Sequence, residues 1–158
     1  MKDHIIRALA TGFYSGYSPV VAGTVGSIPP LALAYFFIEG AVATLAVVAA
    51  LTTLVSIWAA GEGERLFGHD SKMIVSDEWA GMFITLLFVP HDPLNYLIAF
   101  ICFRVFDVVK VWPAGAAERL PGGWGVTMDD VVAGIQANLA TQLIIWGLTT
   151  VGATVALR

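Results

Sequence analysis

The sequence has few charged residues and almost no cysteine. Only 13% of its 158 residues are charged, and Cys102 is the single cysteine. One cysteine excludes an intramolecular disulfide and a cysteine-based metal cluster. The formal net charge of −4 argues against nucleic acid as a partner, because binding to the phosphate backbone requires clustered Lys and Arg.

The chain is rich in apolar residues instead. Hydrophobic residues make up 58% of the sequence, and the mean hydropathy is +0.80. An ordinary soluble domain of this size is less apolar and more charged, so we expect a protein embedded in a membrane. Because no linker, low-complexity tract or internal repeat divides the chain, residues 1–158 are expected to form one domain.

The apolar residues fall into five runs that predict helices, with negligible strand content. These runs cover residues 28–38, 41–60, 79–89, 94–103 and 129–157. Breaks at Glu39-Gly40 and at residues 90–93 predict two helical hairpins. Residues 1–7 lack the features of a secretory signal and favour a short amphipathic helix at an interface. The expected fold is all-α, a compact membrane bundle of about four or five apolar helices plus that short N-terminal helix.

Two of these runs are short for a membrane span. Runs 79–89 and 94–103 supply about half of the roughly 20 residues that a span requires. They cross the bilayer only if their charged flanks pack inward, and a partly inserted bundle is the alternative.

The basic residues predict which side of the membrane the polar segments face. Seven of the eight fall in segments that two hairpins would place on one side, which the positive-inside rule makes cytoplasmic. They are Lys2, Arg7, Arg65, Lys72, Arg104, Lys110 and Arg119, while Arg158 lies at the other end of the last helix. We therefore expect a multi-pass protein whose polar site is at the cytoplasmic face.

Five acids are the candidate site. Asp77-Glu78 and Asp129-Asp130 are adjacent pairs that each open an apolar run, and Asp107 lies between them in the sequence. A carboxylate beside hydrocarbon is costly unless a cation or hydrogen bonds compensate it. Oxygen ligands of this kind suit Mg²⁺ rather than Zn²⁺. All five are therefore predicted metal ligands, and Asp77, Glu78, Asp107 and Asp130 are the predicted catalytic acids.

Helix capping is the alternative interpretation of the two acid pairs. Thr127 and Asp130 have the spacing of a capping box, and Ser76 has the position of a cap before Asp77. Acids near a helix start are also favoured by the helix macrodipole. For Asp129-Asp130 taken alone, capping explains the pattern better. Capping does not explain why two adjacent acids occur at both places, on the same side of the membrane as Asp107.

Cations and a glycine-rich segment predict a phosphate site next to these acids. Arg104 and Lys110 are each three residues from Asp107, so all three share one helix face. This is either a salt-bridged stripe or a phosphate-facing pair beside a metal ligand. Residues 12–27 are dense in glycine and hydroxyls, and they predict an anion-binding loop with Ser15, Gly23 and Thr24 as phosphate contacts. A turn with Thr24 or Ser27 as helix cap explains that segment equally well.

The sequence contains no common covalent phosphatase nucleophile. It has no Cys followed by Arg after five intervening residues, no Asp-x-Asp-x-Thr and no Ser-Gly-His. Two His-Asp dipeptides, at residues 69–70 and 91–92, are interpreted mainly as loop residues. His69 and Asp70 are kept as secondary candidates for the site.

Four ordered segments closely resemble the phosphatidylglycerophosphatase A family. They are residues 12–27 (Gly-Phe-x-Ser-Gly-x-Ser-Pro-x-x-x-Gly-Thr-x-Gly-Ser), 74–82, 103–110 and 122–134, and they cover nearly the whole chain. The sequence departs from the family pattern at Val111 and Ala22, where a proline is common. The resemblance implies a bacterial inner-membrane, Mg²⁺-dependent phosphatase that converts phosphatidylglycerophosphate to phosphatidylglycerol and phosphate.

The mechanism expected from the acids is hydrolysis by a metal-activated water, with Arg104, Lys110 and the N–H groups near Gly23 and Thr24 clamping the phosphate oxygens. Two other functions fit the sequence less well. A small transporter or channel would distribute its acids through the membrane depth, and a phosphotransferase acting on CDP-activated alcohols would carry a longer aspartate array. The sequence leaves the oligomeric state open.

Overall fold

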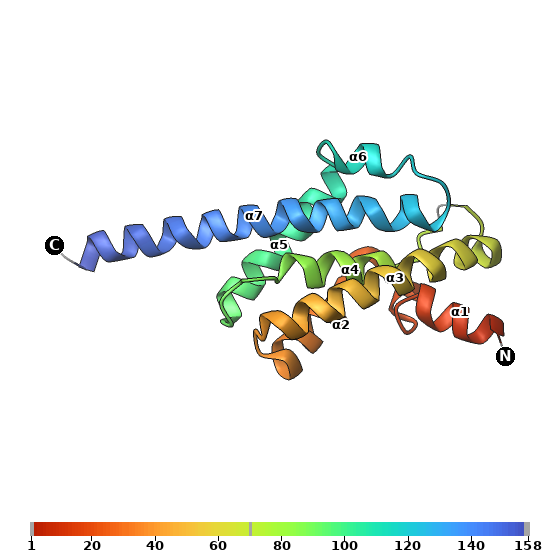
Figure 1. Ribbon diagram of the computed structural model, residues 1–158, viewed down its shortest axis with the longest axis horizontal. Coiled ribbons are helices and arrows are strands. Elements are labelled where there is room, and N and C mark those ends of the chain that lie inside the picture. The colour runs from red at the N-terminus through yellow and green to blue at the C-terminus, as the bar shows by residue number, and fades with distance from the viewer. Residues whose placement is uncertain (1, 70, 157–158) are drawn as a thin grey trace.

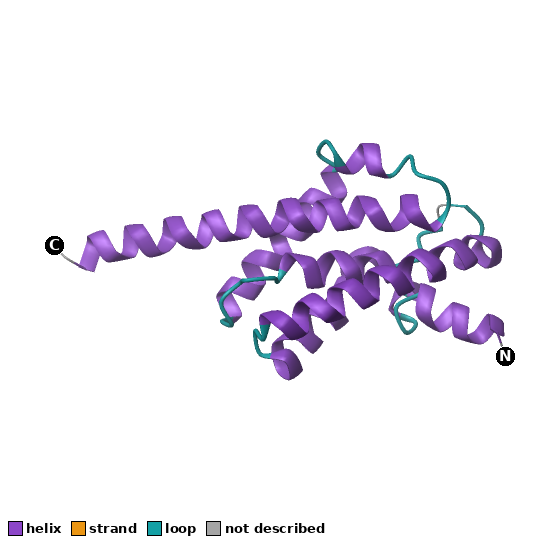
Figure 2. Ribbon diagram, in the orientation of Figure 1, coloured by secondary structure: helices purple, strands orange, loops and turns teal. Residues whose placement is uncertain are grey.

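The computed structural model describes residues 2–69 and 71–156, and for residues 152–156 the backbone alone. Every regular element within those ranges is helical (Figure 2). The elements in chain order are α1 (Lys2–Ala10), the 3-10 turn η1 (Ser15–Tyr17), α2 (Ala22–Leu33), the π-helical segment η2 (Ala34–Ile38), α3 (Val42–Phe67), α4 (Ser76–Thr85), α5 (Pro93–Val109), α6 (Ala114–Ala117) and α7 (Gly123–Ala156). The all-α prediction is confirmed for this part of the chain.

Helix α4 lies at the centre of the bundle. It packs against α3 on one side and α7 on the other, while α2 and α5 also contact it (Figure 1). Met82 and Phe83 of α4 form the core together with Phe103 of α5 and Ala133 of α7. Seven of the ten residues of α4 are buried, so this helix is enclosed by protein.

Two glycines allow α4 and α7 to approach closely. A Cβ on Gly81 would lie 2.5 Å from two ring carbons of Phe103 and 2.8 Å from the backbone oxygen of Asp130. A Cβ on Gly134 would lie 2.6 Å from the backbone oxygen of Gly81. The Thr85 hydroxyl also donates to the backbone oxygen of Gly134 at 3.3 Å. This contact holds the second half of α4 beside the turn of α7 that contains Gly134.

The number of membrane helices differs from the prediction. Two helices are long and apolar enough to cross a membrane, Val42–Phe67 and Gly123–Val151, which is fewer than the four or five expected. The shorter apolar helices, α4 with 10 residues and α5 with 17, are below the usual length of a span. The apolar residues of α4 fill the protein core, so this run does not add a membrane span.

Helix α7 extends well beyond the bundle. Its C-terminal half runs past the ends of the other helices in Figure 1. Leu143, Trp146 and Val151 on this half are exposed, with 67%, 69% and 61% of their surface accessible. An apolar surface of this kind is suited to lipid, in keeping with a membrane protein.

The two predicted hairpin turns are confirmed. Glu39 and Gly40 have φ angles of 52° and 76° and end the first apolar segment. At the second turn, the Asp92 carboxylate caps α5 by accepting the Leu94 N–H at 2.9 Å, and Pro93 is the first helical residue. The Gly40 backbone lies against His91, so both turns are at the same end of the bundle.

Two helices begin six residues earlier than predicted. Helix α2 begins at Ala22 where residue 28 was expected, and α7 begins at Gly123 where residue 129 was expected. In both cases the first turns are rich in glycine and hydroxyl residues, so the apolar pattern starts late. The predicted N-terminal helix is present as α1, whose Ile6 and Ala10 are buried and which packs on α3.

Candidate functional site

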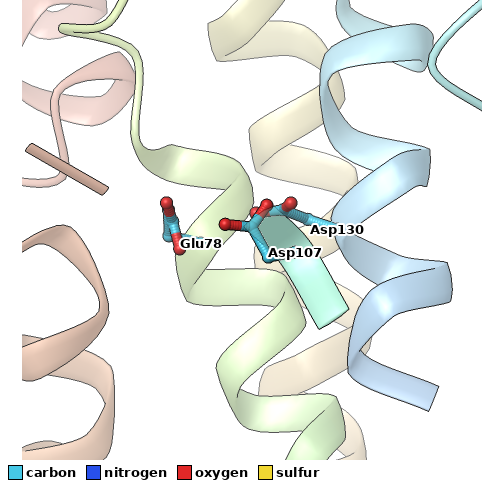
Figure 3. A group of neighbouring side chains, drawn as sticks. All are labelled: Glu78, Asp107 and Asp130. Atoms are coloured by element: carbon cyan, nitrogen blue, oxygen red, sulfur yellow. The ribbon is translucent and has the colours of Figure 1, made fainter. Parts of the chain in front are cut away.

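Three carboxylates from three helices meet at one end of the bundle. Glu78 on α4, Asp107 on α5 and Asp130 on α7 each offer one oxygen, and these oxygens lie within 4.8 Å of one another. Figure 3 shows the three side chains directed into the same space between the helices. Glu78 and Asp130 are buried, with only 7% and 3% of their surface exposed. The structure thus brings together three of the five predicted ligands.

The other two predicted acids, Asp77 and Asp129, lie beside this cluster. Asp77 Oδ1 accepts a hydrogen bond from the Glu78 backbone N–H at 3.0 Å. Asp129 Oδ2 accepts one from Lys110 Nζ at 2.9 Å. All five acids and Lys110 line a single cavity of about 270 Å³. Asp77 and Asp129 therefore face the same space without belonging to the closest trio.

Arg104 ties two of the carboxylates together. Its guanidinium forms an ion pair with Glu78 and a second one, at 3.0 Å, with Asp107 one helical turn away. Ser27 of α2 completes the arrangement, since its hydroxyl donates to Glu78 Oε2 at 2.7 Å and accepts from Arg104 at 3.1 Å. The salt-bridged interpretation of this helix face thus holds for Arg104 and Asp107, whereas Lys110 pairs with Glu118 and Asp129. Ser27 was considered only as a helix cap.

Lys110 joins α5 to α7 at the edge of the cavity. Besides Asp129, its ammonium group donates to Glu118 Oε1 at 2.5 Å. Its backbone has a φ of 49°, which ends α5 and turns the chain toward α6. The partner Glu118 was missed in the sequence because it lies in a loop with no regular spacing from the acids.

Burial shifts the ionisation of several of these groups. Desolvation, aided by the nearby charge of Asp107 and opposed by Arg104, raises the pKa of Glu78 to about 8. Burial and the adjacent Glu78 also raise the pKa of Asp77 well above its ordinary value. Burial acts to lower the pKa of Lys110, but its hydrogen bonds to Glu118 and Asp129 prevail and raise it. The carboxylates at α4 thus hold protons more readily than exposed acids do.

The cluster has the features of a cation site. Asp130 Oδ2 is buried and has no hydrogen-bond partner among the described residues. When all three carboxylates of the trio are ionised, Arg104 neutralises one charge and leaves two. Unpartnered carboxylate oxygen and excess negative charge are what a hard divalent cation compensates. The residues present therefore fit a divalent metal ion, with Glu78, Asp107 and Asp130 as nearest ligands.

The start of α2 lies directly against the cluster. A Cβ on Gly23 would overlap Glu78 Oε1 and would lie 3.0 Å from Arg104 Nη2. Gly23 and Glu78 also line a second cavity, of about 560 Å³, together with Lys72. Thr24 follows Gly23 in the first turn of α2. Two of the three predicted loop contacts are therefore on the helix that borders the site.

Ser15 is placed away from the acids. Its hydroxyl donates to the backbone oxygen of Gly12 at 2.7 Å, and it is not among the described residues that line either of the two cavities at Glu78. Its role as a phosphate contact remains a prediction that this position does not favour.

The capping interpretations are wrong for all four hydroxyl residues. Thr24 and Ser27 lie inside α2, whose N-cap position is Val21. The N-cap of α4 is Val75, without a side-chain cap, and Thr127 lies inside α7. Ser56 of α3 instead contacts the Thr127 hydroxyl at 2.9 Å and donates to the Ser76 hydroxyl at 3.2 Å. This buried group joins α3, α4 and α7 just beside the acid pairs, so Asp129 and Asp130 are not first-turn acids.

His69 and the second His-Asp dipeptide are at different ends of the molecule. His69 lines the cavity of the five acids, and Glu64, to which it is hydrogen-bonded at 2.6 Å, lines it too. Asp70 lies outside the described residues. His91 is at the hairpin end, where its Nε2 is 2.9 Å from the backbone oxygen of Tyr35, and Asp92 caps α5. The loop interpretation thus fits the second dipeptide.

Comparison with known proteins finds a family and several relatives. The family model of phosphatidylglycerophosphatase A matches residues 8–145. A Bacteroides thetaiotaomicron protein named putative phosphatidylinositol-3-phosphatase is 38% identical, over 87% of this chain and 92% of the relative. Phosphatidylglycerophosphatase A of Escherichia coli is 35% identical, over 80% and 76% of the two chains. Its Haemophilus influenzae namesake is 34% identical over 88% of each chain. No solved structure matches.

Proposed function

The chain belongs to the phosphatidylglycerophosphatase A family, and we propose that it hydrolyses phosphatidylglycerophosphate to phosphatidylglycerol and inorganic phosphate in a magnesium-dependent reaction. Family membership and the two relatives of that name make it a phosphatase. The observation that carries the proposed mechanism is the carboxylate trio of Glu78, Asp107 and Asp130, with its unpartnered buried oxygen on Asp130.

The metal would be held by carboxylates from three helices. Glu78, Asp107 and Asp130 would be its nearest ligands, with Asp77 and Asp129 beside them in the same cavity. A bound Mg²⁺ supplies positive charge to the phosphoryl oxygens and lowers the pKa of water. Oxygen-only ligands of this kind are the donor set that Mg²⁺ prefers.

The chain's own cations would hold the phosphate. Phosphoryl transfer depends mainly on positioning and on neutralising charge. Arg104 already lies between Glu78 and Asp107, and Lys110 faces the cavity through its contact with Asp129. The backbone N–H groups of Gly23 and Thr24, in the first turn of α2, would add donors on the opposite side of Glu78.

A carboxylate would remove the proton of the attacking water. Glu78 is the leading candidate, because its raised pKa of about 8 lets it bind a proton near neutral pH. Ser27 and Arg104 both contact its Oε2. Oε1 is therefore the atom we assign to the proton transfer. In that role Glu78 would not ligate the metal, which Asp107 and Asp130 would hold with Asp77 and Asp129 beside them.

The proposed setting is the bacterial inner membrane, with the site at its cytoplasmic face. Two helices long enough to span a bilayer, and the exposed apolar half of α7, support membrane embedding. The positive-inside distribution of the basic residues supports the orientation. The acyl chains of the lipid would stay in the bilayer while the headgroup enters the acid-lined cavity.

A second candidate substrate is a phosphoinositide. The Bacteroides relative named putative phosphatidylinositol-3-phosphatase is 38% identical to this chain. Both lipids carry a phosphomonoester beyond a phosphodiester, so the same cluster would serve either one. Concentration of the acids at one end of the bundle disfavours the transporter and the phosphotransferase, which would distribute them differently.

Phosphate release by the detergent-solubilised protein tests the proposal. Phosphatidylglycerophosphate, phosphatidylinositol 3-phosphate and phosphatidic acid would be compared, each with Mg²⁺ and with chelator. We expect the fastest turnover on phosphatidylglycerophosphate and its loss without divalent metal. Preference for the phosphoinositide would replace the proposed substrate.

Two isosteric variants test the cluster. Asp107→Asn and Asp130→Asn should each lower kcat by at least about 10²-fold, as expected when transition-state charge is no longer balanced. Glu39→Gln is the matched control, because this acid is exposed at the hairpin end and should leave turnover unchanged. Wild-type rates in either cluster variant would refute the assignment.

A further inference from the structure

A second pair of polar side chains lines the cavity of the five acids. Glu64 is near the end of α3, and His69 lies in the segment that joins α3 to α4. The charged groups that share the cavity with them are Asp77 and Glu78 of α4, Asp107 of α5, Lys110, Glu118, and Asp129 and Asp130 of α7. His69 is thus the histidine that faces the reaction space within the described part of the chain.

The contact with Glu64 fixes how the imidazole presents its protons. His69 Nδ1 lies 2.6 Å from Glu64 Oε1. An ionised carboxylate only accepts hydrogen bonds, so Nδ1 is the donor, and Nε2 is the atom left to exchange a proton. The Glu64 side chain is 14% exposed whereas that of His69 is 90% exposed. A sheltered carboxylate therefore orients a solvent-facing imidazole at the cavity mouth, the same division of roles as in a catalytic triad.

Hydrolysis of an alkyl phosphate needs a proton donor as well as an attacking water. An alkoxide is a poor leaving group, so its oxygen must gain a proton as the bond to phosphorus breaks. The cluster carboxylates are assigned to the metal and to the water. Arg104 does not give up a proton in proteins, and Lys110 is assigned to the phosphate oxygens. Histidine is the side chain that gains and loses protons near neutral pH.

We propose that His69 protonates the leaving oxygen of the substrate and that Glu64 positions it, an inference that rests on the proposed phosphatase function. In this step the water oxygen forms a bond to phosphorus, and the bond from phosphorus to the glycerol oxygen breaks. The electron pair of the broken bond goes to the glycerol oxygen, which takes the proton from Nε2 of His69. Phosphatidylglycerol leaves with a neutral hydroxyl group on its terminal glycerol carbon and keeps the charge of its phosphodiester. The proton lost by the attacking water balances the one His69 gave, and His69 is recharged from solvent.

The test replaces the oxygen that must be protonated. Two substrates are compared: phosphatidylglycerophosphate, and its analogue with sulfur in place of the oxygen that bridges the terminal glycerol carbon and phosphorus. A thiolate leaves without protonation, because a thiol has a pKa of about 8.5. For His69→Asn we expect kcat on the oxygen ester to fall by about 10²-fold or more, the usual contribution of general acid catalysis. On the sulfur ester the variant should stay within about threefold of the wild type.

Two further variants complete the design. Glu64→Gln should show a smaller loss on the oxygen ester that the sulfur ester again removes, because it disturbs only the orientation of His69. His91→Asn is the matched control, since that histidine lies at the hairpin end against Tyr35, and it should leave both rates unchanged.

The outcomes separate the inference from the proposed function. Equal losses on both esters, or less than a threefold loss on the oxygen ester, would overturn the role of His69. Failure of the wild type to hydrolyse phosphatidylglycerophosphate would refute the proposed substrate instead. In that case the same oxygen and sulfur pair built on phosphatidic acid carries the test of His69.

Discussion

Replacing Gly81 with alanine should disturb both the stability and the site, because this glycine lies at the contact of α4, α5 and α7. The new Cβ would be 2.5 Å from two ring carbons of Phe103, whereas ordinary contact begins at 3.4 Å. The ring would have to move by 3.4 − 2.5 = 0.9 Å. Phe103 is fully buried, so it has no open space to enter.

The same methyl group would also press on the backbone of α7. Its distance of 2.8 Å from the backbone oxygen of Asp130 requires a separation of 3.4 − 2.8 = 0.6 Å. Overpacking of this kind costs about 1 to 3 kcal/mol. The better helix propensity of alanine offsets at most about 1 kcal/mol. Where this offset applies in full, the net loss of stability is at most about 2 kcal/mol.

Activity should fall by more than this loss of stability explains. Glu78 is one turn before Gly81 on α4, and Asp130 is the residue whose backbone is displaced, so the separation between these two members of the trio would grow by about 0.6 Å. Misplacement by about 1 Å at a reaction centre costs on the order of 10²-fold in rate. Thermal denaturation in detergent and kcat for phosphate release would be measured together.

Gly147→Ala is the control for Gly81→Ala. Gly147 lies in the same kind of helix, on α7, and a Cβ there meets nothing within 4 Å. This variant should keep full activity and should not lose stability. A Gly81→Ala protein with the melting temperature and turnover of the wild type would refute the packing argument.

Two further predictions follow from the same geometry. Gly23→Ala should lower activity by about 10²-fold, because the new methyl group would overlap Glu78 Oε1 and crowd Arg104. The melting temperature should change little, since alanine is a good helix former. A fully active variant would contradict the placement of α2 at the site. In chelator, stability should fall as the pH rises from about 4.5 to about 8 and should level off above that. The pKa of Glu78 is raised from 4.5 to about 8 in the folded protein, so over this range the folded state holds a proton that the unfolded state has lost. Excess Mg²⁺ should flatten this pH dependence. Melting curves at several pH values, with chelator and with Mg²⁺, would measure both effects. Stability that increases with pH in chelator would contradict the prediction.

The acids of the site were predictable from the sequence because they are unusual in their surroundings. Carboxylates at the start of apolar runs are costly, so Glu78, Asp107 and Asp130 were identified without coordinates. Ser27 was not identified as a partner of these acids, because it is 51 residues from Glu78 and shares no pattern with it. Pairing between helices is decided by packing, which a single sequence does not encode as a spacing.

The number of membrane helices was predicted less well than the presence of helices. Apolar runs in α3 and α4 look alike in composition, but only the first is long enough to cross a bilayer. Whether an apolar side chain faces lipid or protein depends on which neighbours approach it. For α4 this is decided by the close contact of Gly81 with Gly134, two glycines 53 positions apart whose pairing no local pattern reveals.

The same contact explains how one short helix organises the site. Because α4 is enclosed, the charges at its first turn cannot turn toward bulk water, and burial raises the pKa values of Asp77 and Glu78. Arg104 compensates one charge of the trio, and the remaining two need protons or a cation. Without a cation, protons satisfy part of this need up to about pH 8 through Glu78, and a divalent metal satisfies it by displacing them. Burial of α4 by its neighbours is therefore the physical reason why three separate helices form a site that favours a hard cation.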